Sequence, residues 1–251
     1  MQKEEAVYSS MNAPEFPVVY TEFDGKDINA LHGYIQNMGN QAVGDTISVL
    51  PEDRKLAIRV KEYGNGIAGL SYEVRNLSMD RLIEKTEVED WQAEGEDIRA
   101  VLPIQNLLTQ NETYLLDIKI STGEKDIHYY TRIMWADSDH AGDMLRLAED
   151  FTRKSLDYDQ ARDLVSYLET NSTEDNSSLG NVSMKASFDH LTWDGLTTEM
   201  EGEPQITLQV YDGIMGQIQV EYKVRITDST GVQSLVNAED NFTMKWNNKR
   251  I

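Results

Sequence analysis

The residues that could perform acid–base or metal chemistry are numerous acids and few histidines. The chain has 44 aspartates and glutamates, four histidines and no cysteine. The histidines His32, His128, His140 and His190 stand in unrelated contexts, without the paired spacing that zinc or a nucleophile–base arrangement requires. We therefore expect them to be strand, turn or helix-start residues. The sequence predicts no catalytic residue and no cofactor.

The segment DSDHAGD comes closest to a metal-binding motif. Asp137, Asp139 and Gly142 fall at the first, third and sixth positions of a calcium loop. The fifth position is Ala141 and the twelfth is Ala148, where such a loop needs oxygen ligands. Acids in the first turn of a helix, stabilised by its dipole, explain the segment better. We expect no bound metal.

Charge and hydropathy restrict the partners. The formal net charge is −21, which repels nucleic acid and anionic lipid surfaces. No window approaches the roughly 20 consecutive apolar residues of a membrane span, so we expect no direct membrane insertion by this segment. The absence of cysteine argues against a secreted eukaryotic protein. It suits a cytosolic protein or an extracytoplasmic protein of an anaerobe.

The first half of the chain has the pattern of antiparallel strands. Apolar and polar residues alternate with a period of two, and the breaks have turn composition. Short strands at this spacing favour a β-sandwich. We expect strands at TISVL (46–50), KLAIRV (55–60), GLSYEVR (69–75), RLIEKTEV (81–88), DIRAVL (97–102), YLLDIKI (114–120) and IHYYTRIMW (127–135).

After Ala136 the spacing of the apolar residues changes to that of amphipathic helices, and later in the chain it returns to that of strands. Apolar stripes predict two helices, at 139–155 and 158–169, and Asp157 with Gln160 has the spacing of a capping box. Burial of both stripes would place Phe151, Leu164 and Leu168 in an interdomain core and join the domains rigidly. Strand alternation then recurs at Val182–Phe188, Ile206–Val210, Ile218–Ile226 and Phe242–Trp246.

These patterns predict a mostly β protein in four segments. The chain would comprise a flexible lead-in (1–15), a sandwich (16–136), a two-helix connector (137–170) and a second, smaller antiparallel β-domain (171–251). We expect the native protein to continue beyond the last residue. Whether residue 1 is a natural start is left open.

The strand IHYYTRIMW is apolar on both faces. One face carries Ile127, and the other carries His128, Tyr130, Arg132 and Met134. A strand that is apolar on both faces is normally covered on both faces, and the helices are the favoured cover. The alternative is an exposed interaction surface formed by these four residues, since Tyr, Arg and Met are enriched in binding patches.

Tyr114 follows a polar turn and opens an alternating strand, six residues after Leu108. This spacing predicts a tyrosine corner, in which the hydroxyl bonds to the backbone of the preceding turn. On these residues, and on Leu56-x-Ile58-x-Val60, the region from about 40 to 135 resembles a fibronectin type III domain. The family's usual tryptophan in strand B is missing, since residues 54–62 contain no aromatic residue, and Gln110-Asn111 stands where the family often has Pro-Gly. The resemblance implies an immunoglobulin-like fold and implies nothing about catalysis.

The whole chain, through FDGKDINALHGYIQ, RLIEKTEV and YLETNSTEDN, also resembles membrane-anchored extracytoplasmic proteins of anaerobic Gram-positive bacteria. The resemblance implies a location at the cell surface, with an anchor outside this chain. We therefore expect a non-enzymatic scaffold or binding module with a protein or glycan partner. The alternative is a carbohydrate-binding module that uses Trp91, Tyr130 or Trp193 for stacking. A third possibility is the accessory domain of a hydrolase, since paired carboxylates can hydrolyse glycosides. With 44 acids in the chain, however, some pair lies close together in any fold, so proximity alone does not indicate this activity.

Overall fold

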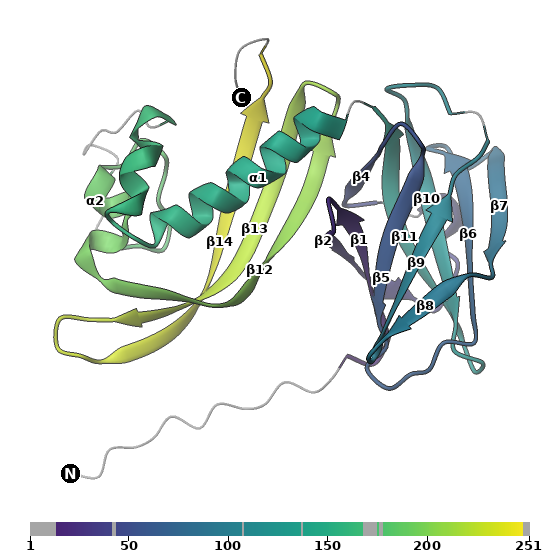
Figure 1. Cartoon of the computed structure of the whole chain (residues 1–251), viewed down its shortest axis with the longest axis horizontal. Helices are drawn as coiled ribbons and strands as arrows, with labels where there is room; N and C mark the ends of the chain where they lie inside the picture. The colour runs from purple at the N-terminus through teal and green to yellow at the C-terminus, as the bar shows by residue number, and fades with distance from the viewer. Residues whose placement is uncertain are drawn as a thin grey trace.

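The computed structural model describes residues 14–41, 44–106, 108–136, 138–167, 175 and 178–247. The described residues have a mostly β fold with three sheets, two in the N-terminal part and one in the C-terminal part (Figure 1). The N-terminal strands are β1 (Val18–Phe23), β2 (Lys26–Leu31), β3 (Gly33–Tyr34), β4 (Ile47–Leu50), β5 (Lys55–Lys61), β6 (Gly69–Asn76), β7 (Leu82–Val88), β8 (Trp91–Glu94), β9 (Asp97–Pro103), β10 (Thr113–Ser121) and β11 (Asp126–Trp135).

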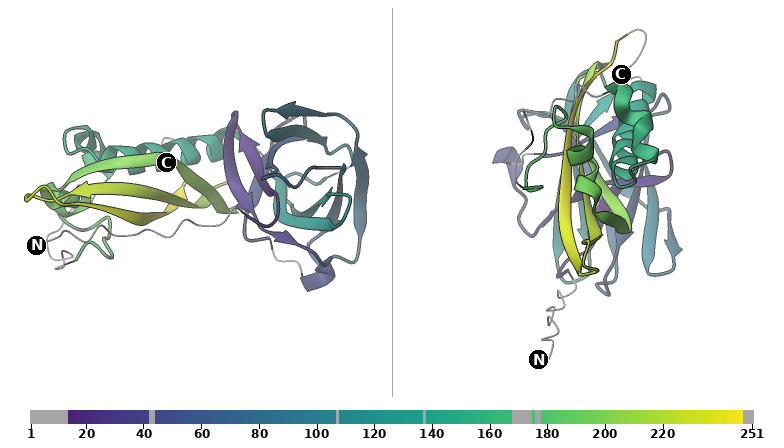
Figure 2. Two further views of the ribbon diagram at one scale, coloured as in Figure 1. Left: turned by 90° about the horizontal axis from the view of Figure 1, so that it is seen from below. Right: turned by 90° about the vertical axis from the view of Figure 1, so that its left-hand side faces the viewer.

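The C-terminal part begins with a helix and ends with three long strands. Its elements are α1 (Ser138–Ser155), the 3-10 helix η2 (Gln160–Tyr167), the short helix α2 (Phe188–Leu191), the 3-10 helix η4 (Trp193–Gly195), β12 (Thr197–Tyr211), β13 (Met215–Thr227) and β14 (Gln233–Lys245). The long helix α1 lies along one face of the sheet formed by β12, β13 and β14, as both Figure 1 and the left view of Figure 2 show.

The two N-terminal sheets are formed by non-consecutive strands. The first has the order β2-β1-β5-β9-β8, and the second has the order β3-β11-β10-β6-β7, with β4 also pairing in parallel to β11. All seven strands expected between residues 46 and 135 are present, with ends that differ by one residue at most. Of the described strands, β1, β2, β3 and β8 were not individually predicted.

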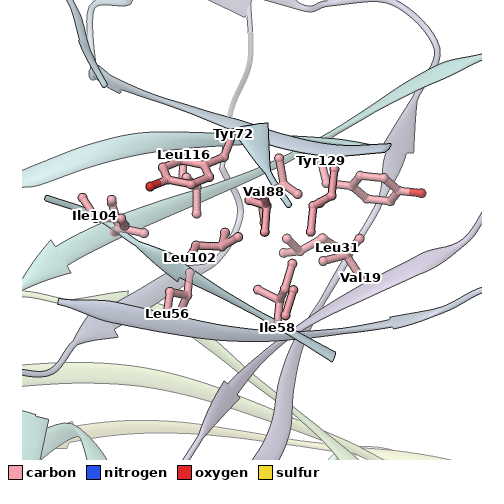
Figure 3. Packing of buried hydrophobic residues seen from close by; sticks show 14 of the residues in the cluster. Val19, Leu31, Leu56, Ile58, Tyr72, Val88, Leu102, Ile104, Leu116 and Tyr129 are labelled. Carbon is pink, nitrogen blue, oxygen red and sulfur yellow. The ribbon is translucent and has the colours of Figure 1, made fainter. Parts of the chain in front are cut away.

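Alternate residues of both N-terminal sheets meet in one hydrophobic core (Figure 3). On β5 the inward residues are Leu56, Ile58 and Val60, which alternate with partly or fully exposed neighbours. Tyr72 of β6 and Leu116 of β10 face them from the second sheet. The period-two pattern was therefore a correct guide to the inward face of these strands.

Tyr114 forms the contact that its spacing predicts. The side chain is 7% exposed, and Leu108 at the start of the turn is also buried. The backbone N–H of Thr109 donates to the Tyr114 hydroxyl at 2.9 Å. The hydroxyl in turn donates to the Glu112 carboxylate at 3.0 Å. The phenol thus fixes the turn that leads into β10.

The predicted first helix is confirmed, and its apolar stripe packs on the C-terminal sheet. Ala141, Met144, Ala148 and Phe151 belong to a second core cluster with residues of β12, β13 and β14. The helix approaches β13 so closely that a Cβ on Gly216 would lie 2.7 Å from the Met144 sulfur. The Met144 side chain therefore occupies the space that a Cβ at position 216 would need.

Two expectations for the following segment need correction. The second helix is a 3-10 helix over Gln160–Tyr167, preceded by Asp157, whose carboxylate accepts from the Gln160 N–H. Leu164 is buried as predicted, whereas Leu168 lies outside the described residues. The strand expected from Val182 is wrong, because the described residues there form turns that lead into α2. The overlooked signal is the N-cap Ser187, whose side chain accepts from the backbone of the helix.

The second core cluster also includes residues of the N-terminal part. Ile28, Ile47, Val49 and Met134 lie in the same cluster as the residues of α1 and of the C-terminal sheet. Phe151 and Leu164 therefore lie in a core to which both parts of the chain contribute, as predicted. Apolar burial of this kind is the main favourable term that holds the two parts together.

We predict that Tyr114→Phe lowers the free energy of unfolding by about 0.5–1.5 kcal/mol, because the Thr109 N–H loses its acceptor. Tyr63→Phe is the matched control, since Tyr63 is 45% exposed. Urea denaturation of the three proteins measures both changes. An equal effect of the two substitutions would show that the corner hydroxyl does not stabilise the fold.

Candidate functional site

The strip of alternate residues on β11 that the sequence singled out lies on the outer face of the second sheet. His128, Tyr130, Arg132 and Met134 project away from the N-terminal core, whose inward residues on this strand are Ile127, Tyr129 and Ile133. Tyr130 is 5% exposed and Met134 is 3% exposed. Tyr130 and Met134 are therefore buried on this outer face, and His128 and Arg132 are partly buried.

The cover comes from three different places. Tyr130 accepts a hydrogen bond from the Met38 N–H at 3.0 Å, and the ring of Tyr34 lies 5.9 Å from its own ring. Burial raises the pKa of the Tyr130 phenol to about 12. Met134 packs in the second core cluster with residues of α1. The helix therefore covers only one end of the strip, and residues before β4 cover the other.

Arg132 is used inside the molecule. Its guanidinium donates to the backbone carbonyl of Gln209 on β12, and also to the carbonyl of Thr46 at 3.4 Å. Burial lowers the pKa of Arg132. This side chain joins the N-terminal part to the C-terminal sheet, so it cannot serve as a free recognition residue.

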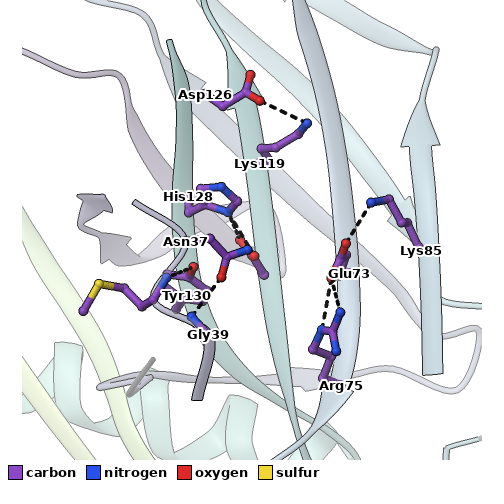
Figure 4. A network of polar contacts seen from close by, with 11 residues as sticks. Asn37, Gly39, Glu73, Arg75, Lys85, Lys119, Asp126, His128 and Tyr130 are labelled. Atoms are coloured by element: carbon purple, nitrogen blue, oxygen red, sulfur yellow. Dashed lines mark hydrogen bonds and ion pairs between the residues drawn. The ribbon is translucent and has the colours of Figure 1, made fainter. Parts of the chain in front are cut away.

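A polar network occupies the rest of this outer face (Figure 4). At its centre, His128 Nδ1 lies 2.9 Å and 3.0 Å from the two carboxylate oxygens of Asp117. Burial raises the pKa of Asp117, and the contact with His128 opposes that rise. Lys119 and Asp126 form an ion pair at 3.3 Å nearby. An aspartate paired with a histidine could orient the imidazole for acid–base work.

Glu73 on β6 continues the network. It accepts hydrogen bonds from Arg75 at 3.0 Å and from Lys85 at 2.9 Å. Burial works to raise the pKa of Glu73, but the hydrogen bonds from Lys85 and Arg75 together lower it. Glu73 therefore lies next to two opposite charges, and Lys119 lies next to Asp126. The described contacts of the His128 ring are with the Asp117 carboxylate and with the stacked ring of Tyr130.

The other histidines occupy the kinds of position that the sequence predicts. His140 lies in the first turn of α1 and stacks on Trp246 with a ring separation of 4.1 Å. His190 lies in α2, and its Nδ1 is 2.7 Å from the Asp194 carboxylate. His32 falls between β2 and β3. These three lie in separate parts of the structure.

The structure gives the DSDHAGD segment a packing role. Asp137 lies outside the described residues, and Asp139 stands in the first turn of α1. A Cβ on Gly142 would lie 2.9 Å from the ring of Phe23, so the close approach of these elements explains the glycine. Among the residues that the structure describes, no three metal-ligating side chains come together.

The aromatics proposed for sugar stacking are also engaged in packing. Trp91 packs partly buried against the N-terminal core, and Trp193 packs against the second core cluster. Tyr130 is buried, as described above. Tyr34, above it, is 37% exposed and was not singled out by the sequence.

Sequence reasoning missed a groove between α1 and the end of β14. We call it the α1–β14 groove. It has a volume of about 180 Å³ and is lined by Leu147, Phe151, Met184, Phe242, Thr243, Met244 and Lys245. The alternation of Phe242 and Met244 signalled a strand. That alternation could not reveal the groove, because the groove also depends on α1 and on the loop that carries Met184.

Asp240 lies on β14 close to the α1–β14 groove and links this strand to α1. Its carboxylate accepts from the Thr152 hydroxyl of α1 at 2.6 Å and from the Tyr222 hydroxyl at 3.2 Å. Burial raises the pKa of Asp240 despite these two hydrogen bonds. The α1–β14 contact therefore contains a carboxyl group whose charge is poorly solvated.

No protein-family model matches the chain, and the comparison with curated proteins finds no match either. None of the helices among the described residues has the length and apolar character of a membrane span. The interpretation of the surface therefore rests on the contacts, burial and charge described above.

The raised pKa of Asp240 predicts a defined pH dependence. A group with a raised pKa in the folded state adds stability below its unfolded pKa, about 3.9 for aspartate, and loses it as the pH rises through the folded pKa. The free energy of unfolding of the wild type, minus that of Asp240→Asn, should therefore fall as the pH rises above about 4. Urea denaturation at a series of pH values measures this difference.

Asp228→Asn provides a control of opposite sign. Hydrogen bonds from the Thr230 side chain and then from turn N–H groups lower the pKa of Asp228. Its contribution is therefore present above the unfolded pKa and lost as the pH falls, so the corresponding difference should rise with pH. Parallel pH profiles for the two variants would contradict the assignment of Asp240.

Proposed function

We propose that this chain is a non-enzymatic scaffold or binding module of a larger, membrane-anchored extracytoplasmic bacterial protein. The observation that carries the proposal is the joining of two β parts through one shared core, with an apolar groove left at the far strand of the C-terminal sheet. A module that presents such a groove on a fixed support suits the binding of a protein segment. The net charge of −21 and the absence of cysteine fit an extracytoplasmic protein of an anaerobe.

The finer fold assignment belongs to the same proposal. We infer that residues 16–136 form an immunoglobulin-like β-sandwich of the fibronectin type III kind. Three observations support it: the Tyr114 corner, the shared core of the two sheets, and the neighbours β1-β5-β9 on one sheet and β11-β10-β6-β7 on the other. Within the connector predicted at 137–170, α1 also belongs to the C-terminal domain, since it covers one face of that sheet.

A protein partner is favoured over a glycan by the state of the aromatic residues. A sugar-stacking platform needs exposed aromatic faces. Trp91 and Trp193 pack against the two cores and Tyr130 is buried, whereas Tyr34 is partly exposed. The mutually paired charges around Asp117 and Glu73 favour a stable surface over a hydrolytic site.

We predict that the purified protein binds peptides or proteins from a bacterial surface display library with a saturable isotherm. It should give no saturable signal on a glycan array and no turnover of glycoside or peptide substrates. Saturable glycan binding that is lost in Tyr34→Ala would replace the proposal with the carbohydrate-binding alternative. Turnover that survives repurification would replace it with a hydrolase function.

A further inference from the structure

β14 is the outer strand of the C-terminal sheet, and its hydrogen-bonding direction can be derived. Among the described strands it pairs only with β13. The hairpin closes with the Asp228 N–H donating to the Val232 carbonyl, and Trp246 N–H donates to the Ile214 carbonyl at the other end. In an antiparallel ladder with a regular register, bonded pairs alternate. The even-numbered residues of β14 therefore bond to β13, and the odd-numbered residues direct their N–H and C=O groups outward.

The side chains of β14 alternate in the same way. Phe242 and Met244 face α1, as do Val236, Ala238 and Asp240, which are partly buried. The odd-numbered side chains of the strand are exposed on the opposite face. If a further strand paired with the outer edge of β14, every second side chain of that added strand would lie on the face of the sheet that α1 covers. At Phe242 and Met244 those side chains would enter the α1–β14 groove.

The size of the groove suits side chains of a strand. Pockets for small-molecule ligands usually have volumes of roughly 300–1,000 Å³. The groove, at about 180 Å³, is smaller and mostly apolar in its lining. It also adjoins backbone groups that an extended chain can bond. Main-chain bonds along an edge, combined with pockets for alternate side chains, define recognition by strand addition.

We infer that β14 binds an extended segment of another protein as a fourth strand, with alternate apolar side chains in the α1–β14 groove and basic residues between them. The inference rests on the proposed binding function and names the class of partner. The charge of the chain selects the partner: two copies, each with a formal charge of −21, repel one another, whereas a basic segment is attracted.

The probe is a fluorescein-labelled synthetic peptide of alternating lysine and valine, titrated with the full chain and followed by fluorescence anisotropy. We expect saturable binding. The same peptide with N-methyl groups on the edge that pairs with β14 should bind at least about tenfold more weakly, because it cannot donate those hydrogen bonds. A peptide with glutamate in place of lysine should also bind more weakly.

Two pairs of variants test the surface on the protein. Asn241→Pro removes an outward N–H without removing a bond to β13, and Asn241→Ala keeps that N–H. Met184→Asp places a charge in the groove, and Met215→Asp is its control, since both methionines are 41% exposed. We expect roughly tenfold weaker binding for the first member of each pair and unchanged binding for the second.

The outcomes separate this inference from the proposed function. Equal binding of the methylated and unmethylated peptides, or equal effects within both pairs of variants, would overturn strand addition at β14. The methylated peptide keeps the test valid even where Asn241→Pro fails to fold. If library binders identified for the intact protein are unaffected by Met184→Asp, the binding function stands and the site lies elsewhere. If neither library nor peptide binds, both proposals fall.

Discussion

The amide of Asn29 is the contact on which the joining of the two parts depends. The residue is fully buried and has a φ of 52°, which is uncommon for a residue with a side chain. Its amide nitrogen lies within hydrogen-bonding distance of the Thr21 hydroxyl, the Ile47 carbonyl and the Ser48 hydroxyl. Its oxygen accepts from the Leu208 N–H of β12 at 2.8 Å. A buried amide is stable only when it is bonded in this way.

Two interruptions of strand register meet at this contact. On β2 the pairing passes from Ile28 to Ala30, so that Asn29 is the extra residue of a bulge. On β12 it passes from Leu208 to Val210, so that Gln209 is the extra residue. Asn29 bonds to the N–H before the second bulge, and Arg132 bonds to the carbonyl of the bulged residue itself. Bulges redirect backbone and side chains, and here they align one sheet with another. The contacts of Asn29 and Arg132 with β12 hold the C-terminal sheet against the N-terminal part. The strand β14 lies at the opposite edge of that sheet.

Sequence patterns predicted the features that depend on near neighbours. The alternation in β5, β6 and β10 specified both strand and inward face, and the spacing from Leu108 to Tyr114 specified a hydrogen bond. The stripe of α1 specified the buried face of the helix. These features need only the side-chain period and a short turn, so they can be inferred from one sequence.

The features that failed depend on tertiary context. A strand was predicted from the alternation of four apolar residues: Val182, Met184, Ala186 and Phe188. The segment instead forms turns and the start of α2. The prediction failed because a short run of alternating apolar residues is compatible with several structures. Arg132 looked like a recognition residue because its partner, the Gln209 carbonyl, is far away in the chain. The α1–β14 groove requires a helix, a strand and a loop to be placed together, and no local pattern encodes their relative position.

The central claim is that Asn29 and the shared core hold the two parts of the chain in one arrangement. Pulsed electron spin resonance between labels on Glu87→Cys and Glu239→Cys tests it directly, because the native chain has no cysteine and both positions are exposed. The account predicts one narrow distance distribution for this protein. It predicts a broader one when Asn29→Ala is added, since partners buried at the contact lose their bonds at a cost of about 1–3 kcal/mol. A broad distribution before Asn29 is changed would contradict the account.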